Sequence, residues 1–219
     1  MKKIRRRHRY KKENRIKKIL ITHIENNLKD YIIIAILFII GIICGIFFIN
    51  NVNNNQYSEI EQYINNSIEV LKNEGDINVL PNLFSSLKNN IILVILLWLF
   101  GMILIGGVFV YSIVIARGFL LGYTISSFIT VLGIGKGSLL ALSALFLQNV
   151  IFIPCLFTIA VSAKTLYKSI MNGREKSRIK VDIIRHTLIT GIMSIFIIVS
   201  SLVEIYVSRQ LFIFSINWF

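Results

Sequence analysis

Cysteine is nearly absent from the chain, and so are the motifs of the common enzyme classes. The two cysteines, Cys44 and Cys155, both fall inside long apolar runs, so neither a disulfide framework nor a thiol metal site is expected. The sequence has no HExxH, no nucleophile elbow and no paired carboxylates within an apolar run. The glycine-rich stretch 133–137 lacks the length and the Ser/Thr of a phosphate-binding loop and indicates a turn. We therefore expect neither enzymatic activity nor a metal or other cofactor.

Long apolar runs dominate what is present. Hydrophobic residues make up 55% of the 219, above the roughly 45–50% of a soluble domain. About 20 apolar residues cross a bilayer core of about 30 Å. Windows that reach or approach this length begin at Tyr31, Ile91, Gly118, Ser138 and Thr187. We predict an all-α fold, a polytopic membrane helix bundle of about five transmembrane helices. The first span, residues 31–49, is too long for the apolar part of a cleaved signal peptide and is expected to remain as an anchor.

Basic residues are distributed unevenly along the chain, which carries 24 Lys and Arg against 11 Asp and Glu. They are concentrated in residues 1–30 and in the loop 164–186, which predicts that both segments, and hence the N-terminus, are cytoplasmic. The same rule places the helical loop 50–90 and the aromatic tail 208–219 outside, flanking a membrane bundle over residues 91–207. We expect the basic segment 1–30, with its interfacial helix, to bind anionic membrane lipid rather than nucleic acid.

The segment 50–90 is the only sizeable polar region expected on the outer side. Ser58 and Glu61 form a capping box, and the apolar stripe that follows predicts a helix from about residue 59 to residue 74. Two interpretations of the stripe stay open: it rests on the membrane or on the tops of the spans, or it docks an extracytoplasmic partner. The candidate docking stripe consists of Ile60, Ile64, Ile68 and Leu71.

Arg117 stands alone within a long apolar run. Residues 91–132 suffice for two crossings with almost no loop, so the chain has to turn within them. A turn at Arg117 makes the third span short, whereas a turn near residues 111–112 places the arginine about 8 Å inside the third helix. Both alternatives make Arg117 an interface or turn charge near the cytoplasmic face, with a side chain long enough to reach the headgroups. Glu204, near the outer end of the last span, is too distant to pair with it.

Small residues at four-residue spacing indicate where the helices pack closely. Gly118 and Gly122 have this spacing in the third span, and Gly41 and Gly45 repeat it in the first. The pattern favours a compact bundle without identifying a binding site.

Two adjacent amides, Gln148 and Asn149, lie near the middle of the fourth span, where an unpaired amide costs several kcal/mol. Pro154 cannot donate a hydrogen bond to the carbonyl of Val150, which predicts a kink about one turn past the amides. We favour interhelical hydrogen bonding beside a kink over a substrate or ion site.

The order of these features resembles the stage II sporulation protein M family of endospore-forming bacteria. The resemblance rests on the basic start, the glycine pair of the first span, the outside helical segment and residues 117–154, RGFLLGYTISSFITVLGIGKGSLLALSALFLQNVIFIP. Its most specific positions are Gly118, Phe119, Gly122, Gly133, Gly137, Gln148, Asn149 and Pro154.

The resemblance implies a noncatalytic membrane scaffold for endospore engulfment. Such a protein lies in the mother-cell membrane at the sporulation septum and the engulfing membrane. There it recruits and anchors the peptidoglycan-degrading stage II sporulation proteins D and P; a homo-oligomer stays open. The alternative is a small permease or a transporter membrane subunit, because glycine-rich helices with a kinked, polar midpoint also suit a transport pathway. The missing catalytic residues and the outside helix favour the scaffold.

Overall fold

The computed structural model describes residues 24–73, 79–103, 105–173 and 175–203, together with Tyr206, Gln210 and Phe214. Most of the basic segment 1–30, including most of its predicted interfacial helix, lies outside the described residues, as do Glu204 and most of the aromatic tail. Leu71 is described as part of a helix, but its side chain is not.

The described residues fold into helices only, as the apolar periodicity predicted. The helices are α2 (Leu28–Asn50), α3 (Asn54–Asn73), α4 (Val79–Met102), α5 (Gly106–Met171) and α6 (Lys176–Val203). α5 is a hairpin of two arms, because Gly133 leaves the helical conformation with φ at 80°, a backbone geometry that glycine adopts without strain. The first arm covers residues 106–132 and the second arm residues 134–171. The predicted glycine-rich turn is therefore present, and it is made by the first glycine of the stretch.

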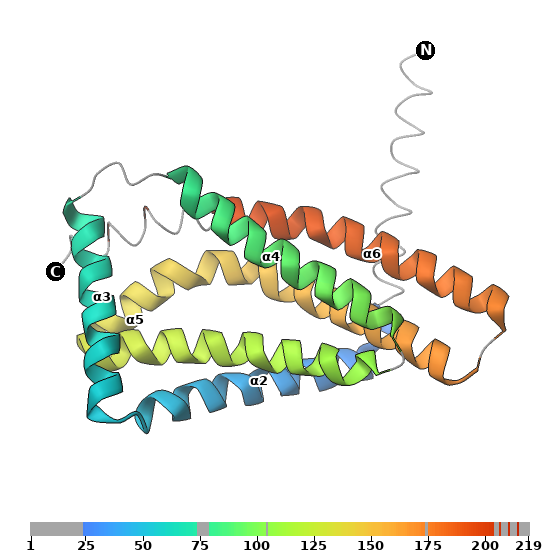
Figure 1. Ribbon diagram of the computed structural model, residues 1–219, viewed down its shortest axis with the longest axis horizontal. Coiled ribbons are helices and arrows are strands. Elements are labelled where there is room, and N and C mark those ends of the chain that lie inside the picture. Colours follow the sequence, from blue (N-terminus) through green and yellow to red (C-terminus); the bar gives the residue numbers. More distant parts are fainter. Residues whose placement is uncertain are drawn as a thin grey trace, which may run out of the picture.

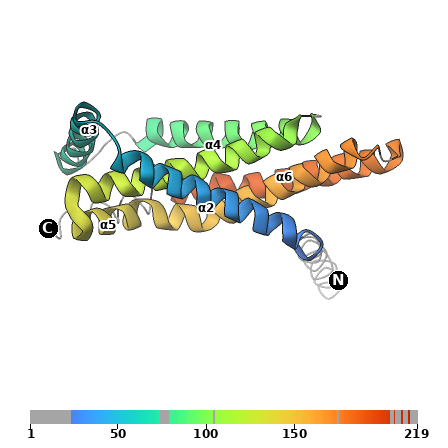
Figure 2. The same ribbon diagram turned by 90° about the horizontal axis from the view of Figure 1, so that it is seen from below.

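α2, α4, α6 and both arms of α5 run along one axis, and α3 lies across one end of this bundle (Figures 1 and 2). We call this the α3 end; the α5 hairpin turn lies there too. The opposite end carries the start of α2 and the connections from α4 to α5 and from α5 to α6. We call it the basic end, because the loop between α5 and α6 and the residues around it carry most of the described lysines and arginines.

The second arm of α5 lies at the centre of the bundle. Its side chains at Phe152, Leu156 and Ile159 are fully buried, and α2 contributes Ile34 and Phe38 to the same apolar cluster. From the other side α4 and α6 complete this core with Val94, Leu97, Ile189, Met193 and Ile197. The outer surfaces of α2, α4 and α6 remain lined with exposed isoleucine, leucine and phenylalanine, which is the pattern of helices that face lipid.

Four stretches of helix are long and apolar enough to cross a membrane. They are Leu28–Asn50, Gly106–Ser143, Gln148–Met171 and Lys176–Val203, of which Gly106–Ser143 extends past the hairpin turn at Gly133. The apolar stretch Leu87–Met102 of α4 is shorter. The structure thus confirms a polytopic helical membrane protein with four to five crossing helices.

The turn between the second and third spans lies earlier than either predicted position. α4 ends at Met102 and α5 begins at Gly106, so Arg117 is inside a helix and not at a turn, and residues 111–112 are helical as well. Hydropathy did not mark this turn because the turn itself is apolar: it contains Ile103 and Ile105, and both side chains are exposed.

The helix of the outer segment also begins earlier than predicted, at Asn54. The amide of Asn53 donates to Oε1 of Gln56 at 3.3 Å, the contact that closes a capping box. Ser58 lies inside the helix, where its hydroxyl donates to the carbonyl of Asn55 at 2.7 Å. The residues that form this contact at the start of the helix are therefore Asn53 and Gln56 rather than Ser58 and Glu61.

Candidate functional site

α3 is held against the tip of the α5 hairpin by its apolar stripe. Ile64 is buried, with 5% of its surface exposed, and Ile60 is half-buried. Ile68 packs against Leu140 of the second arm, in a small cluster that includes Phe128 of the first arm. The described members of the predicted docking stripe therefore rest on the tops of the spans.

The opposite face of α3 is polar and exposed. At helical spacing it presents Glu59, Gln62, Asn66 and Glu69. Tyr63, on the flank of this face, has 75% of its surface exposed. Because α3 lies across the end of the bundle (Figure 1), this outer face points away from the membrane-crossing helices. It is an exposed polar surface at the α3 end.

The two glycine pairs recognised in the sequence meet across the contact between α2 and the first arm of α5. A Cβ at Gly41 or Gly45 would collide with the backbone of Ile115 or Phe119. In the reverse direction, a Cβ at Gly118 would collide with the carbonyl of Phe38, and one at Gly122 with the carbonyl of Ile42. The backbones therefore approach more closely than any side chain allows, which is the use of small residues in membrane helices.

Arg117 reaches toward the interior of the bundle rather than toward the basic end. Lys164 lies 5.4 Å from the centre of the Tyr111 ring, which puts Tyr111 at the level of the basic end; Arg117 follows about 9 Å further along the helix. Its guanidinium lies 4.3 Å from the ring centre of Phe152, a residue about 18 Å from Lys164 along the second arm. The arginine therefore stacks on a buried aromatic ring. The sequence had predicted instead that its side chain extends to the headgroups at the basic end.

The two amides of the fourth span have different surroundings. Gln148 is buried, and its backbone carbonyl accepts a hydrogen bond of 3.0 Å from Ser200 of α6. Asn149 is half-buried, and its side chain donates to the carbonyl of Leu145 in the same helix at 2.8 Å. The bond of Asn149 is thus intrahelical, in contrast to the interhelical bond expected for it. The second arm arches over its length, and Pro154 lies within it (Figure 1).

A second polar contact joins α4 and α6 near the α3 end. Asn90 is buried and donates to the hydroxyl of Ser201 at 2.8 Å. Ser200, the neighbour of Ser201, connects α6 to the second arm of α5 through the carbonyl of Gln148. None of these contacts of Asn90, Ser200 and Ser201 was predicted from the sequence. The signal was present, because small polar residues within an apolar span are candidates for contacts between helices.

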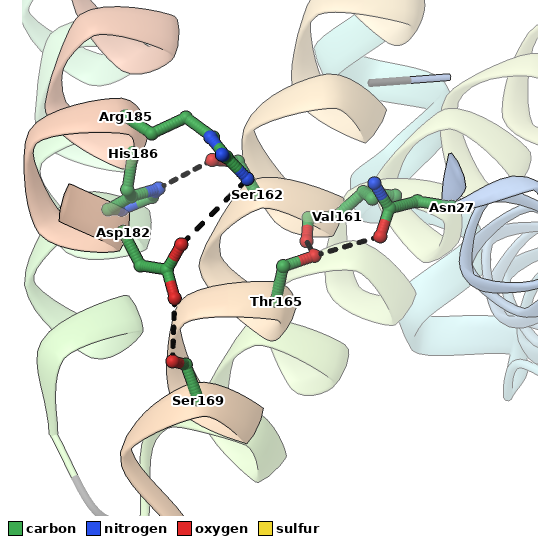
Figure 3. A network of polar contacts seen from close by, with 8 residues as sticks. All are labelled: Asn27, Val161, Ser162, Thr165, Ser169, Asp182, Arg185 and His186. Carbon is green, nitrogen blue, oxygen red and sulfur yellow. Dashed lines mark hydrogen bonds and ion pairs between the residues drawn. The ribbon is translucent and has the colours of Figure 1, made fainter. Parts of the chain in front are cut away.

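A polar network ties α6 to the second arm of α5 at the basic end (Figure 3). Ser169 donates to Oδ2 of Asp182 at 2.6 Å, and Nη1 of Arg185 lies 3.8 Å from the other carboxylate oxygen. One turn along, Nδ1 of the buried His186 lies 3.0 Å from the hydroxyl of Ser162. These contacts fix the register of the two helices at the basic end.

The same end is joined to α2 by an ion pair and a hydroxyl contact. Nζ of Lys164 lies 2.7 Å from Oδ1 of Asp30, with both side chains largely shielded from solvent. The hydroxyl of Thr165 lies 3.2 Å from Oδ1 of Asn27 and 2.8 Å from the carbonyl of Val161 (Figure 3). Lys164 and Asp30 are thus paired with each other within the chain.

Apolar side chains separate the polar contacts at the two ends. Between Gln148 and Ser162 the buried positions of the second arm are Phe152, Cys155, Leu156, Ile159, Ala160 and Val161, together with Thr158. The hydroxyl of Thr158 donates to the carbonyl of Pro154 in its own helix at 2.8 Å. In the part of the chain that the structure describes, no group of three or more His, Cys, Asp or Glu is placed to hold a metal ion.

The fold and these contacts define a class: a polytopic helical membrane protein whose charged and polar side chains join helices, capped at one end by an amphipathic helix. The model of the family described as Stage II sporulation protein M matches residues 34–209. The chain belongs to this family, and it is accordingly a membrane protein of sporulation engulfment. Neither a curated protein nor a solved structure matches the chain.

Proposed function

We propose that the chain is a noncatalytic scaffold in the mother-cell membrane. It recruits and anchors the peptidoglycan-degrading stage II sporulation proteins D and P at the septum. Family membership supports a role in engulfment. The observation that carries the scaffold role is α3, an amphipathic helix fixed across the end of the bundle with a polar face turned outward.

The docking surface we propose is the outer face of α3, defined by Glu59, Gln62, Asn66 and Glu69. The apolar stripe contributes indirectly, because Ile64 and Ile68 hold the helix on the hairpin tip. A rigid mount lowers the conformational entropy that binding would otherwise cost. The carboxylates of this face favour partners with a basic contact surface.

The buried contacts favour a scaffold over a small permease. A transport pathway needs polar groups along its length. Here Gln148 and Ser162 are separated along the second arm by buried apolar residues such as Phe152, Leu156 and Ile159. The hydrogen bonds at each end join helices to one another, as expected for a structural bundle.

The test adds positive charge to the outer face of α3 and leaves the apolar stripe unchanged. Gln62→Arg with Asn66→Arg places two cations among the carboxylates of α3. The matched control, Ser85→Arg with Asn89→Arg, makes an equal change at exposed positions with the same spacing on α4. Both variants should accumulate normally in the membrane. In sporulating cells only the α3 variant should fail to copurify with the two wall-degrading proteins and fail to gather them at the septum.

Normal recruitment of the two wall-degrading proteins by the α3 variant would show that this face is not the docking site. Equal loss in the control would also contradict the proposal, because it would trace the defect to added charge on the outer side rather than to α3.

A further inference from the structure

An apolar groove lies between the two arms of α5. It has a volume of about 580 Å³. The second arm of α5 arches away from the first arm along part of its length (Figure 1). The walls of the groove are apolar, with Leu121, Ile125 and Ile129 on the first arm and Leu142, Leu145 and Ile153 on the second. A concave surface of this kind can bind a side chain or a helix of another molecule.

Besides Ser138 close to the hairpin turn, whose hydroxyl is bonded to carbonyls of its own helix, two hydrogen-bonding groups interrupt this apolar wall. Asn149 lines the groove, and among the described residues its side chain makes one hydrogen bond, to the carbonyl of Leu145. A carboxamide has two donor hydrogens and an acceptor oxygen, so one donor and the oxygen remain available. The neighbouring Val150 also lines the groove, and its carbonyl loses its usual helical donor because Pro154 has no N–H.

Both groups lie deep within the membrane-crossing part of the chain. Along the second arm, Asn149 is about 20 Å from Lys136 near the hairpin tip and about 22 Å from Lys164 at the basic end. The two lysines are therefore separated by about the full thickness of a bilayer with its headgroups, 40–45 Å. Lipid tails at that depth offer no hydrogen-bonding partner to an amide or a carbonyl.

We propose that this groove seats one membrane-spanning helix of a partner protein. The occupant carries a hydroxyl or carboxamide side chain level with Asn149, which exchanges hydrogen bonds with the Asn149 amide. The inference deepens the proposed scaffold function and rests on it, because it supplies a membrane contact for a recruited partner in addition to the outer face of α3.

The shape of the groove favours a single helix over a second copy of this chain. A symmetric dimer would bring two identical concave surfaces together, and these leave a void rather than interdigitate. A convex helix fills the space between the arms, and small or polar residues at its contact face allow close approach. Lipid fills the volume but offers no hydrogen-bonding partner to the remaining donor and the oxygen of the Asn149 amide.

The experiment uses the full chain in vesicles of phosphatidylglycerol and phosphatidylethanolamine. The probes are two synthetic membrane-spanning polyleucine helices, one with a central asparagine and one without. Binding is measured by energy transfer from a fluorophore at Asn172→Cys, in a background that lacks Cys44 and Cys155. The asparagine probe should bind about threefold more tightly than the all-leucine probe, the typical effect of one hydrogen bond between membrane helices.

Two pairs of variants test whether the probes bind in the groove or elsewhere on the surface. Asn149→Leu should abolish the difference between the probes, whereas Thr124→Val, which removes a hydroxyl bonded within its own helix, should preserve it. Val150→Trp fills the groove and should weaken both probes. Ile195→Trp, a comparable change at an exposed position on α6, should weaken neither.

Equal binding of the two probes to wild type and to Asn149→Leu would overturn the proposal and leave the groove to lipid. Energy transfer between two labelled copies of the chain that disappears in Asn149→Leu would overturn it in favour of a dimer. These outcomes are independent of septal recruitment. Septal recruitment of the two proteins without probe binding would refute the groove contact but not the scaffold function. Probe binding without septal recruitment would refute the scaffold function but not the groove contact.

Discussion

Replacing Gly122 by alanine tests the close contact between α2 and the first arm of α5. The added methyl group would meet the carbonyl oxygen and Cα of Ile42 at distances that real side chains do not reach. Because the obstructing atoms belong to the backbone, no rotamer change relieves the collision and the two helices have to separate. Overpacking of this kind typically costs about 1–3 kcal/mol.

Gly191 provides the matched control. It lies within α6 with no atom within 4 Å of the position that a Cβ would occupy. Alanine is favoured over glycine inside a helix by about 0.8–1 kcal/mol, and both variants share this gain. The difference in free energy of unfolding between Gly191→Ala and Gly122→Ala is therefore the packing cost alone, about 1–3 kcal/mol.

The assay is unfolding of the purified protein by titration with sodium dodecyl sulfate in mixed micelles. Gly191→Ala should be as stable as wild type or slightly more stable, and Gly122→Ala clearly less stable than Gly191→Ala. Gly41→Ala combined with Gly122→Ala should cost less than the sum of the single changes, because one separation of the helices relieves both collisions. Equal stability of Gly122→Ala and Gly191→Ala would refute the close glycine contact.

Further expectations concern the two ends of the bundle. Ile64→Asp removes about 1.5–3 kcal/mol of apolar burial and should expose α3 to protease in membranes; Gln62→Asp should not, and equal cleavage would contradict the packing of the stripe. Lys164→Ala and Asp30→Ala should each destabilise the protein by about 1–3 kcal/mol, and a double variant as costly as the sum of both would exclude a coupled pair. In protoplasts, an impermeant thiol reagent should label a cysteine at Ser58 and spare one at Asn172 in a background without Cys44 and Cys155. Labelling at position 172 but not at position 58 would show that the chain has the opposite orientation in the membrane.

Composition and periodicity were sufficient for the helical membrane class but not for the position of every turn. Gly133 was recognisable as a turn because glycine tolerates a positive φ. The α4–α5 turn was missed because its residues are as apolar as the helices on either side. Gly101 lies just before this turn and Gly106 and Gly107 just after it, and a Cβ at Gly101 or Gly107 would collide with a side chain of a neighbouring helix.

The amphipathic pattern of α3 predicted a helix with a contact face, but not what that face contacts. Ile64 and Ile68 pack on the hairpin tip, so the stripe is used within the chain. The same limit applies to Asn149, because a carboxamide in a span needs a partner and the sequence does not say whether its own helix supplies one. Tertiary arrangement decides both questions, and a single sequence does not contain it in readable form.

The scaffold function is tested most directly by the position of its proposed partners in sporulating cells. Fluorescent fusions of stage II sporulation proteins D and P are imaged after asymmetric division, in cells with and without this chain. The scaffold account predicts that both fusions gather at the septum only when the chain is present. Without it they should spread over the membrane while septal peptidoglycan stays thick and engulfment stalls. Septal gathering of both fusions in the absence of the chain would contradict the account.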